Sequence, residues 1–343
     1  MEKKHILSID YPTLQKWWGS HGQGLGPEKI MMREFVGKGK LPQESVQIAS
    51  EHFRRVIDTY SWDLPKIVER RESSDTTIKY LIEFSDGKRV ESVAVPFNKK
   101  YTLCLSTQVG CGMKCSFCFT GEQGLSRNLL PQEITGQYIV VWLDLKKTKK
   151  HKVTPNIVFM GQGEPLHNFD HLKTAILGLT SIPGLALGPK QITVSTVGYL
   201  PGLSRWEELP AINLAISLHS PYELERSELI PMNNAFSISK LFALLESFSW
   251  GRRKLINFEY LLIKDKNDSK EHAYALAELT SQFPCMVNII PFNPYPGSLY
   301  QRPPEAKVEE FKAWLVEKKV RAMVRVTKGD EILAACGQLA NQF

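Results

Sequence analysis

The sequence lacks the long apolar runs that mark membrane-spanning or exported proteins. Among its 343 residues, no hydrophobic stretch approaches the ~20 residues that cross a bilayer. The charged residues 1–5 are not followed by the short apolar block of a signal peptide. We also find no internal repeat, low-complexity tract or long disordered linker. These absences predict a cytoplasmic globular protein with no membrane partner.

The composition is that of an ordinary globular protein with a moderate excess of positive charge. Hydrophobic residues make up 43% of the chain and charged residues 23%, and the formal net charge is +7. A chain of this length can bury a large core, as one big α/β domain with a smaller attachment. The positive charge favours a polyanionic partner only weakly, because many basic proteins bind no nucleic acid.

Cysteine is scarce and unevenly distributed. There are six cysteines, and three of them form the pattern C-x3-C-x2-C at Cys111, Cys115 and Cys118. In a cytoplasmic protein, thiols at this density indicate a soft metal centre rather than disulfides. Three thiolates on one loop can bind three irons of a [4Fe-4S] cluster and leave the fourth iron open. A structural zinc site and unconnected thiols remain as alternatives, although we find no second pair of Cys or His ligands for zinc.

The pattern of expected elements divides the chain into four parts. Residues 1–75 have apolar positions at roughly helical spacing, which predicts a small helical accessory domain. Residues 76–97 alternate around the Asp86-Gly87 turn and predict a β-hairpin extension. Residues 98–320 predict a barrel core, and residues 321–343 predict a final strand and a tail that carries Cys336.

Short apolar strands alternate with helices in the predicted core, which is the pattern of a parallel sheet with right-handed crossovers. The predicted strands are residues 103–108, 156–160, 192–196, 214–218, 256–262 and 287–291. The predicted helices are residues 131–145, 169–181, 201–209, 237–248, 270–283 and 305–318.

Several motifs, taken as a set, carry a resemblance to a known family. They are Thr102-Leu103-Cys104 before the three-cysteine loop, Gly161-Gln162-Gly163-Glu164-Pro165, Ser217-Leu218-His219, and Ala334-Ala335-Cys336-Gly337-Gln338-Leu339. This set resembles the RlmN/Cfr methyltransferases, radical S-adenosylmethionine (SAM) enzymes that methylate adenine carbons in RNA. The likeness runs from about residue 83 to residue 339. It implies an α/β fold with a partial (βα)6 radical SAM barrel, a small N-terminal helical domain and a β-hairpin extension.

The resemblance also implies how the cofactors bind. It makes Cys111, Cys115 and Cys118 the ligands of a [4Fe-4S] cluster whose open iron binds SAM. The residues that match the family's SAM contacts are Gly163, Glu164, Ser195, Ser217, Leu218, His219 and Asn293. Taken alone, the glycines fit an ordinary turn and His219 fits a structural histidine. Their place near the carboxyl ends of predicted strands, where α/β barrels bind ligands, favours the cofactor role.

Cys336, Cys104 and Glu91 match the family's catalytic residues, although buried thiols and a solvated strand carboxylate are the ordinary explanations. Adenine ring carbons are not nucleophilic, so the family uses a covalent relay that consumes two SAM molecules per turnover. In it, Cys336 accepts a methyl group from one SAM, and a radical from the second SAM activates that group. Glu91 removes the proton from the adenine carbon, and Cys104 attacks the Cys336 sulfur to release the product. The resulting disulfide must be reduced before the next turnover.

The resemblance implies partners as well. The C-terminal half looks closer to the C2-specific RlmN members than to the C8-specific Cfr, which implies C2 of adenine in 23S ribosomal RNA and some transfer RNAs. A reducing partner such as flavodoxin and a monomeric enzyme are expected, and the basic runs 146–152 and 252–254 are candidate phosphate contacts. One alternative keeps the mechanism but acts at C8 or on another RNA, because the N-terminal module departs from the basic, aromatic pattern expected there. The other alternative is a non-catalytic protein that holds an Fe-S cluster or binds RNA.

Overall fold

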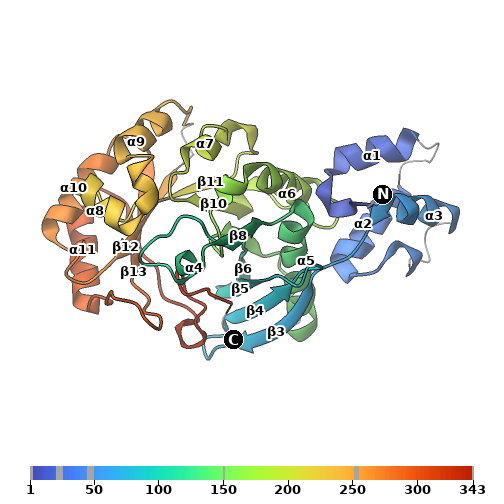
Figure 1. Ribbon diagram of the computed structural model, residues 1–343, viewed down its shortest axis with the longest axis horizontal. Helices are drawn as coiled ribbons and strands as arrows, with labels where there is room; N and C mark the ends of the chain where they lie inside the picture. The colour runs from blue at the N-terminus through green and yellow to red at the C-terminus, as the bar shows by residue number, and fades with distance from the viewer. Residues whose placement is uncertain (1–2, 21–25, 45–49, 150, 251–254, 342–343) are drawn as a thin grey trace.

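A ten-stranded sheet forms the centre of the computed structural model, which describes residues 3–20, 26–44, 50–149, 151–250 and 255–341 (Figure 1). The strand order is β14-β13-β12-β11-β10-β9-β6-β5-β4-β3. All neighbours from β6 to β14 are parallel, whereas β5, β4 and β3 add in antiparallel order beside β6. Within the described residues, β14 and β3 do not pair with each other, so the barrel is open. This confirms the predicted partial (βα)6 barrel.

Helices connect the parallel strands and cover the outer face of the sheet. The parallel strands are β6 (Lys100–Cys104), β9 (Asn156–Phe159), β10 (Ile192–Thr196), β11 (Asn213–Ser217), β12 (Ile256–Leu262), β13 (Cys285–Pro291) and β14 (Ala322–Val324). The main helices between them are α5 (Pro131–Thr148), α6 (Phe169–Ser181), α9 (Ile238–Glu246), α10 (Lys270–Thr280) and α11 (Glu305–Glu317). No helix in the described ranges is long and apolar enough to span a membrane.

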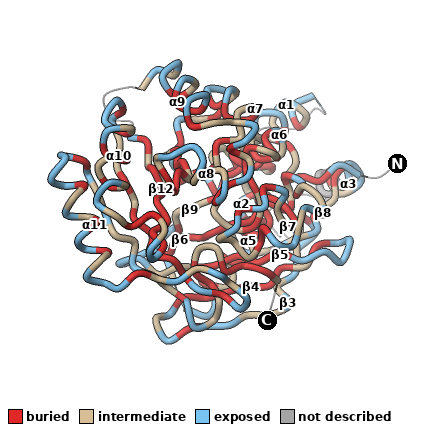
Figure 2. Tube along the Cα trace, turned by 60° about the vertical axis from the view of Figure 1, so that its left-hand side comes forward, coloured by how far each residue is buried: buried red, intermediate tan, exposed pale blue. Residues whose placement is uncertain are grey.

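Strand β12 shows how alternation separates the core from the barrel interior. Phe258 and Tyr260 point to the helices, where their rings stack on Phe242 and Phe311 with centroids 5.6 and 5.1 Å apart. The residue between them, Glu259, points to the opposite face and lines a cavity inside the barrel. Figure 2 shows buried chain running through the sheet and into the helices that cover it.

Two core elements differ from the sequence prediction. The helix expected over residues 201–209 is only the short α7 (Leu200–Leu203) followed by a 3₁₀ turn, η5 (Trp206–Glu208). Gly202 packs so closely against the 3₁₀ turn η3 (Pro165–Asn168) that an added Cβ would lie 2.1 Å from Leu166 O, so tight packing rather than helix periodicity shapes this segment. Helix α8 (Glu223–Leu229) was not predicted, because its seven largely charged residues show no apolar stripe.

The predicted first core strand, residues 103–108, is also divided. Strand β6 ends at Cys104, and a separate strand β7 (Gln108–Gly110) pairs with β8 (Leu125–Asn128) in a small second sheet. The break is fixed by Ser106, whose Oγ donates to Glu91 O at 2.7 Å and accepts from Gln162 N at 2.9 Å. The three-cysteine loop therefore starts outside the barrel sheet.

The extension beside β6 has three strands instead of the predicted two. Strands β4 (Ile78–Glu83) and β5 (Arg89–Phe97) form the expected hairpin, but β3 (Lys66–Glu72) pairs with β4 along the sheet edge. Assigning residues 66–72 to the helical domain was wrong. Their charged sequence does not predict a strand, because an edge strand with two partly exposed faces needs no alternation of apolar and polar residues.

The N-terminal helices α1 (Tyr11–Ser20), α2 (Pro27–Lys38) and α3 (Ser50–Thr59) lie to one side of the barrel, next to α5 and α6 (Figure 1). Trp18 and Phe35 are fully buried in the same hydrophobic cluster as the barrel core. The Tyr11 N–H donates to Ser181 Oγ at 3.3 Å, across from α1 to the end of α6. These helices thus share a core with the barrel.

Candidate active site

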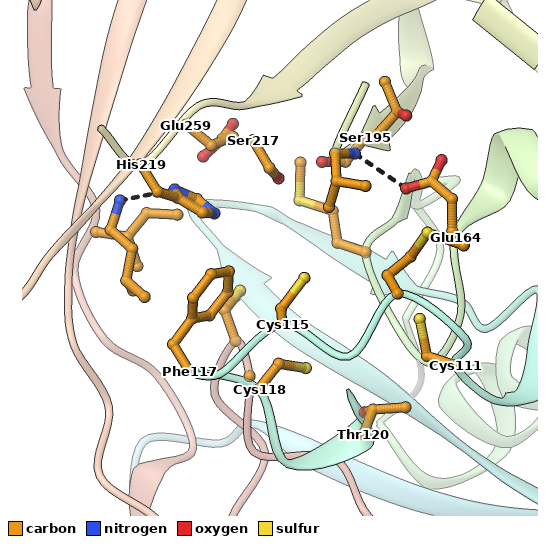
Figure 3. Close-up of a pocket in the computed structure, with 18 of the residues that line it drawn as sticks. Cys111, Cys115, Phe117, Cys118, Thr120, Glu164, Ser195, Ser217, His219 and Glu259 are labelled. Carbon is orange, nitrogen blue, oxygen red and sulfur yellow. Dashed lines mark hydrogen bonds between the residues drawn. The ribbon is translucent and has the colours of Figure 1, made fainter. Parts of the chain in front are cut away.

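The three clustered cysteines border one cavity inside the open barrel (Figure 3). Its volume is about 150 Å³. The predicted site residues that line it are Cys111, Cys115, Cys118, Gly163, Glu164, Ser195, Ser217, His219 and Cys336. Figure 3 shows the cysteine side chains on one side, with Ser195, Ser217 and Glu259 across the cavity from them. We refer to this space as the cofactor cavity.

Backbone geometry holds the three-cysteine loop in a tight turn. Gly110 has φ +76°, and a Cβ added there would lie 1.9 Å from Gly124 O, so only glycine fits. The Cys111 N–H donates to the same Gly124 O at 2.9 Å, and the Cys118 N–H donates to Cys115 O at 3.2 Å. The loop thus turns back on itself and directs its thiols into the cavity.

The chemistry of these thiols fits an iron–sulfur cluster. Burial raises the pKa of Cys111 to about 12 and raises the pKa of Cys115 and Cys118 above the usual thiol value. Bound iron would reverse this, because a metal cation stabilises coordinating thiolates. A [4Fe-4S] cluster binds one thiolate per iron, so three thiols that border one cavity fit its ligand set.

Gly163 and Glu164 form a second tight feature of the cofactor cavity. Gly163 has φ +102°, and a Cβ added there would lie 2.6 Å from the Gln108 Cβ. The Glu164 carboxylate accepts hydrogen bonds from Leu166 N at 3.0 Å and Val197 N at 2.9 Å. Burial nevertheless raises its pKa to about 7, so a cation in the cavity would stabilise its ionised form. An ammonium group is such a cation.

His219 enters the cavity as a neutral side chain. Its Nδ1 accepts from Leu261 N at 3.0 Å, which leaves the proton on Nε2. Burial lowers its pKa to about 3, and the Phe117 ring packs edge-on at a centroid distance of 4.7 Å. Its backbone is held at φ +63°, an unusual conformation for a non-glycine residue. Leu218, just before it, is fully buried and donates its N–H to Glu259 O at 3.0 Å.

Arg226 supports the strand ends beneath this cavity and was missed by sequence reasoning. It is fully buried, and its Nε donates to Leu218 O at 3.0 Å. Its Nη2 donates to Val197 O at 2.7 Å and to Ser217 O at 3.0 Å. One guanidinium therefore joins the chain after β10 to the end of β11. An arginine in a short, charged segment gives no signal of such burial, because most arginines are exposed.

We expect Arg226→Leu to lower the free energy of unfolding by about 3 kcal/mol or more, because it leaves several buried carbonyl groups without their donors. Equilibrium unfolding in urea measures the change. Arg205→Leu is the matched control, because Arg205 forms exposed ion pairs with Asp170 and Glu208, which solvent screens, so this variant should unfold almost as the unmodified protein does. Equal losses in the two variants would contradict the structural role of Arg226.

A second, smaller cavity adjoins the first. It is lined by Cys104, Asn293, Arg325, Thr327 and Cys336, among others. Cys336 and Arg325 border both cavities, so Cys336 faces the cofactor cavity and Cys104 at once. Asn293, predicted as a SAM contact, borders the second cavity, where its Nδ2 donates to Cys336 O at 3.2 Å. In this conformation it holds the tail.

Glu91 is the one predicted catalytic residue that the structure keeps apart, since it is not among the described residues that line either cavity. Its side chain is fully buried and forms an ion pair with the buried Lys79, with Nζ 3.1 Å from Oε1. Its Oε2 accepts from Ala340 N at 3.0 Å. The carboxylate thus holds the tail four residues beyond Cys336.

Two of the lysines predicted to contact phosphate instead bind other residues of the protein. Lys146 donates to Gly37 O of the N-terminal domain, and Lys149 pairs with Glu72. Lys147 and Lys152 are exposed. Lys150 and the run 252–254 lie outside the described residues.

Comparisons with known proteins identify the family. No protein-family model matches the chain. The chain is 44% identical over 273 residues to the dual-specificity RNA methyltransferase RlmN 2 of Myxococcus xanthus (strain DK1622), covering 79% of this chain and 72% of that protein. It also resembles the crystal structure of a radical SAM methyltransferase from Sphaerobacter thermophilus, with a TM-score of 0.89 and 30% identity over 99% of this chain and 100% of that one.

These two similarities extend beyond the motifs that suggested the family. Radical SAM methyltransferases use a [4Fe-4S] cluster and SAM, and the cofactor cavity is lined by four thiols, two buried carboxylates and four hydroxyl groups. The chain belongs to the RlmN/Cfr family of radical SAM RNA methyltransferases.

Proposed function

We propose that this enzyme methylates C2 of adenine in RNA, with 23S ribosomal RNA and some transfer RNAs as substrates, through a methyl relay on Cys336. The relative from M. xanthus is a dual-specificity RNA methyltransferase, which supports two RNA substrates. The observation that carries the relay is the position of Cys336, which borders the cofactor cavity on one side and shares the second cavity with Cys104 on the other. One sulfur can therefore meet both a SAM molecule and the second thiol.

Each cofactor would be held by residues already described. Cys111, Cys115 and Cys118 would bind the cluster. Gly163, Glu164, Ser195, Ser217 and His219, which line the cavity, would surround SAM, whereas Leu218 is fully buried and is not among the residues that line it. When bound, these two groups supply a 5′-deoxyadenosyl radical. Glu164 would accept hydrogen bonds from the SAM ammonium group, and the Nε2–H of His219 offers a neutral donor.

The protein's own residues would carry out the methyl relay. The Cys336 thiolate displaces the methyl group from one SAM, forming a carbon–sulfur bond as the SAM carbon–sulfur bond breaks. After hydrogen removal by the radical from a second SAM, the carbon on Cys336 adds to the adenine ring, and the adduct loses the C2 proton and one electron, which the oxidised cluster would accept. The Cys104 thiolate then attacks the Cys336 sulfur and forms a Cys104–Cys336 disulfide as the Cys336 sulfur–carbon bond breaks. The released carbon takes up a proton to become the methyl group, and the disulfide is reduced before the next turnover. A reductant such as flavodoxin would supply the electrons. A monomer would suffice for the relay, because both thiols lie on one chain.

Glu91 can accept the proton from adenine C2 only after a rearrangement. In the structure its two oxygens are held by Lys79 and by the Ala340 N–H. Because Ala340 belongs to the tail that carries Cys336, release of the tail would free the carboxylate. Proton removal would then follow tail movement.

We expect Glu164→Gln to weaken SAM binding about tenfold or more, because the variant loses a charge-assisted hydrogen bond to an ammonium group. Equilibrium dialysis with labelled SAM on cluster-loaded protein measures this under anaerobic conditions. Glu207→Gln, at an exposed turn, is the control and should bind SAM as the unmodified protein does. Unchanged affinity in Glu164→Gln would contradict the assignment.

The decisive test of the proposed substrate is to map the modified base. The chain is expressed in a bacterial host whose own adenine-C2 methyltransferase gene is deleted, and digested ribosomal and transfer RNA is analysed by mass spectrometry. We expect 2-methyladenosine in both RNA pools. Detection of 8-methyladenosine would favour the C8 alternative. Without any methylated adenosine, formation of 5′-deoxyadenosine from SAM and dithionite would indicate a different RNA, and its absence would indicate a non-catalytic protein.

A further inference from the structure

Arg325 brings a positive charge to the space shared by the two relay cysteines. Its backbone N–H donates to Ile289 O at 2.8 Å, which continues the β13–β14 pairing one residue beyond β14. Its side chain borders both cavities, as Cys336 does, and it borders the second cavity together with Cys104. The guanidinium therefore lies where both thiols face the same space.

Few acceptors compete for this guanidinium. Its Nη1 donates to the Met160 sulfur at 3.6 Å, and a thioether is a weak acceptor. The Glu259 carboxylate faces it from β12, but it accepts from Asn288 Nδ2 at 2.7 Å. Within the part of the chain that the structure describes, Arg325 forms no ion pair with a carboxylate. Several of its five N–H donors are thus available to the thiols.

The other charged groups around Cys104 do not replace Arg325. Lys328 also borders the second cavity, but its Nζ lies 3.9 Å from the carboxylate of Asp75. Cys336, facing Cys104 from the tail, would repel a thiolate when it is ionised itself. Arg325 has no such carboxylate partner among the described residues, and it borders the cavity together with both cysteines.

We propose that Arg325 is a positioning residue that stabilises the Cys104 thiolate and thereby sets how fast Cys104 attacks the Cys336 sulfur. This inference rests on the proposed relay and adds a residue to it. The attacking species in such a step is the thiolate, so its rate depends on the fraction of ionised Cys104. Burial works against ionisation and raises the pKa of Cys104 to about 12, and the charge of Arg325 lowers it. The guanidinium therefore opposes the effect of burial on the Cys104 thiol.

Alkylation of the resting enzyme tests this without RNA. Full-length, cluster-loaded and reduced protein is treated with iodoacetamide at a fixed pH, and mass spectrometry follows the modified Cys104 and Cys285 peptides. Cys285 is the internal control, because it is half-buried at the start of β13 and donates to Thr280 O at 3.5 Å. We expect Arg325→Gln to slow alkylation of Cys104 about tenfold, because a smaller fraction of Cys104 is ionised without the guanidinium. Arg325→Lys keeps the charge and should slow it by about threefold or less.

The outcomes separate charge from structure. A Cys104 rate in Arg325→Gln that is unchanged or faster would overturn the inference. The inference would also be overturned if alkylation of Cys285 slowed by the same factor, because the effect would then be global. Equal alkylation rates of Cys104 in Arg325→Lys and Arg325→Gln would overturn it as well. Slowing confined to Cys104, with rescue by lysine, supports it. Because no methyl transfer is measured, a negative result here leaves the RNA substrate proposal untouched, and a failed RNA mapping leaves this result interpretable.

Discussion

Replacing Cys336 with alanine is expected to abolish methyl transfer to RNA, by about 10³-fold or more, as loss of a covalent nucleophile does in other enzymes. The reason is geometric: Cys336 is the thiol that borders both the cofactor cavity and the cavity of Cys104. Cleavage of SAM to 5′-deoxyadenosine should persist at a measurable rate, because Cys111, Cys115, Cys118 and Glu164 remain. Mass spectrometry of product RNA and of the cleaved cofactor measures both reactions in one sample.

Cys285→Ala is the matched control for this experiment. Cys285 is also a half-buried thiol, but it starts β13, on the side of the barrel away from the strand ends that carry the cofactor cavity. It should retain full methyl transfer and comparable stability. Full activity in Cys336→Ala, or equal loss in both variants, would contradict a relay through Cys336.

Replacing Cys104 with alanine is expected to stop turnover at a different point. Methyl loading of Cys336 and attack on adenine need no second thiol, whereas release of the product from the Cys336 sulfur does. The variant should therefore accumulate protein covalently joined to RNA, up to about one RNA per active enzyme. A denaturing gel shows this species as a slowly migrating band that collapses on ribonuclease treatment.

The double variant Cys104→Ala/Cys336→Ala controls for the site of attachment. It should form no adduct, because the sulfur that holds the RNA is gone. Both single variants are expected to fold, since removal of one thiol deletes little buried volume. An adduct that persists in the double variant, or normal turnover in Cys104→Ala, would exclude product release by Cys104.

Much of the site could be predicted because it depends on short sequence patterns. The Gly163-Glu164 turn and the Ser217-Leu218-His219 segment lie at the carboxyl ends of β9 and β11, and parallel strands deliver these ends to one place. The C-x3-C-x2-C loop follows β7, outside the barrel sheet, and was found from its cysteine spacing alone. The strand–helix alternation likewise predicted the barrel. Periodicity sufficed there because those strands are covered by helices on their outer face.

What the sequence could not show depends on contacts between distant residues. Strand β3 is an edge strand whose charged residues follow no apolar pattern, and Arg226 is buried only because backbone carbonyls of two strand ends converge on it. Glu91 was expected to face the substrate, but its side chain is held by Lys79 and the tail. Glu259 had a usable signal, because it alternates with Phe258 and Tyr260 along β12.

The most direct measurement follows the methyl group itself. Cluster-loaded enzyme is incubated with SAM that carries a trideuterated methyl group, and the Cys336 peptide is analysed before and after RNA is added. We expect the labelled methyl group on Cys336 first, and then on adenine C2 of the RNA with one deuterium fewer, because hydrogen is removed while the carbon is bound to sulfur. A fully deuterated methyl group on the RNA, with no label ever found on Cys336, would contradict the relay.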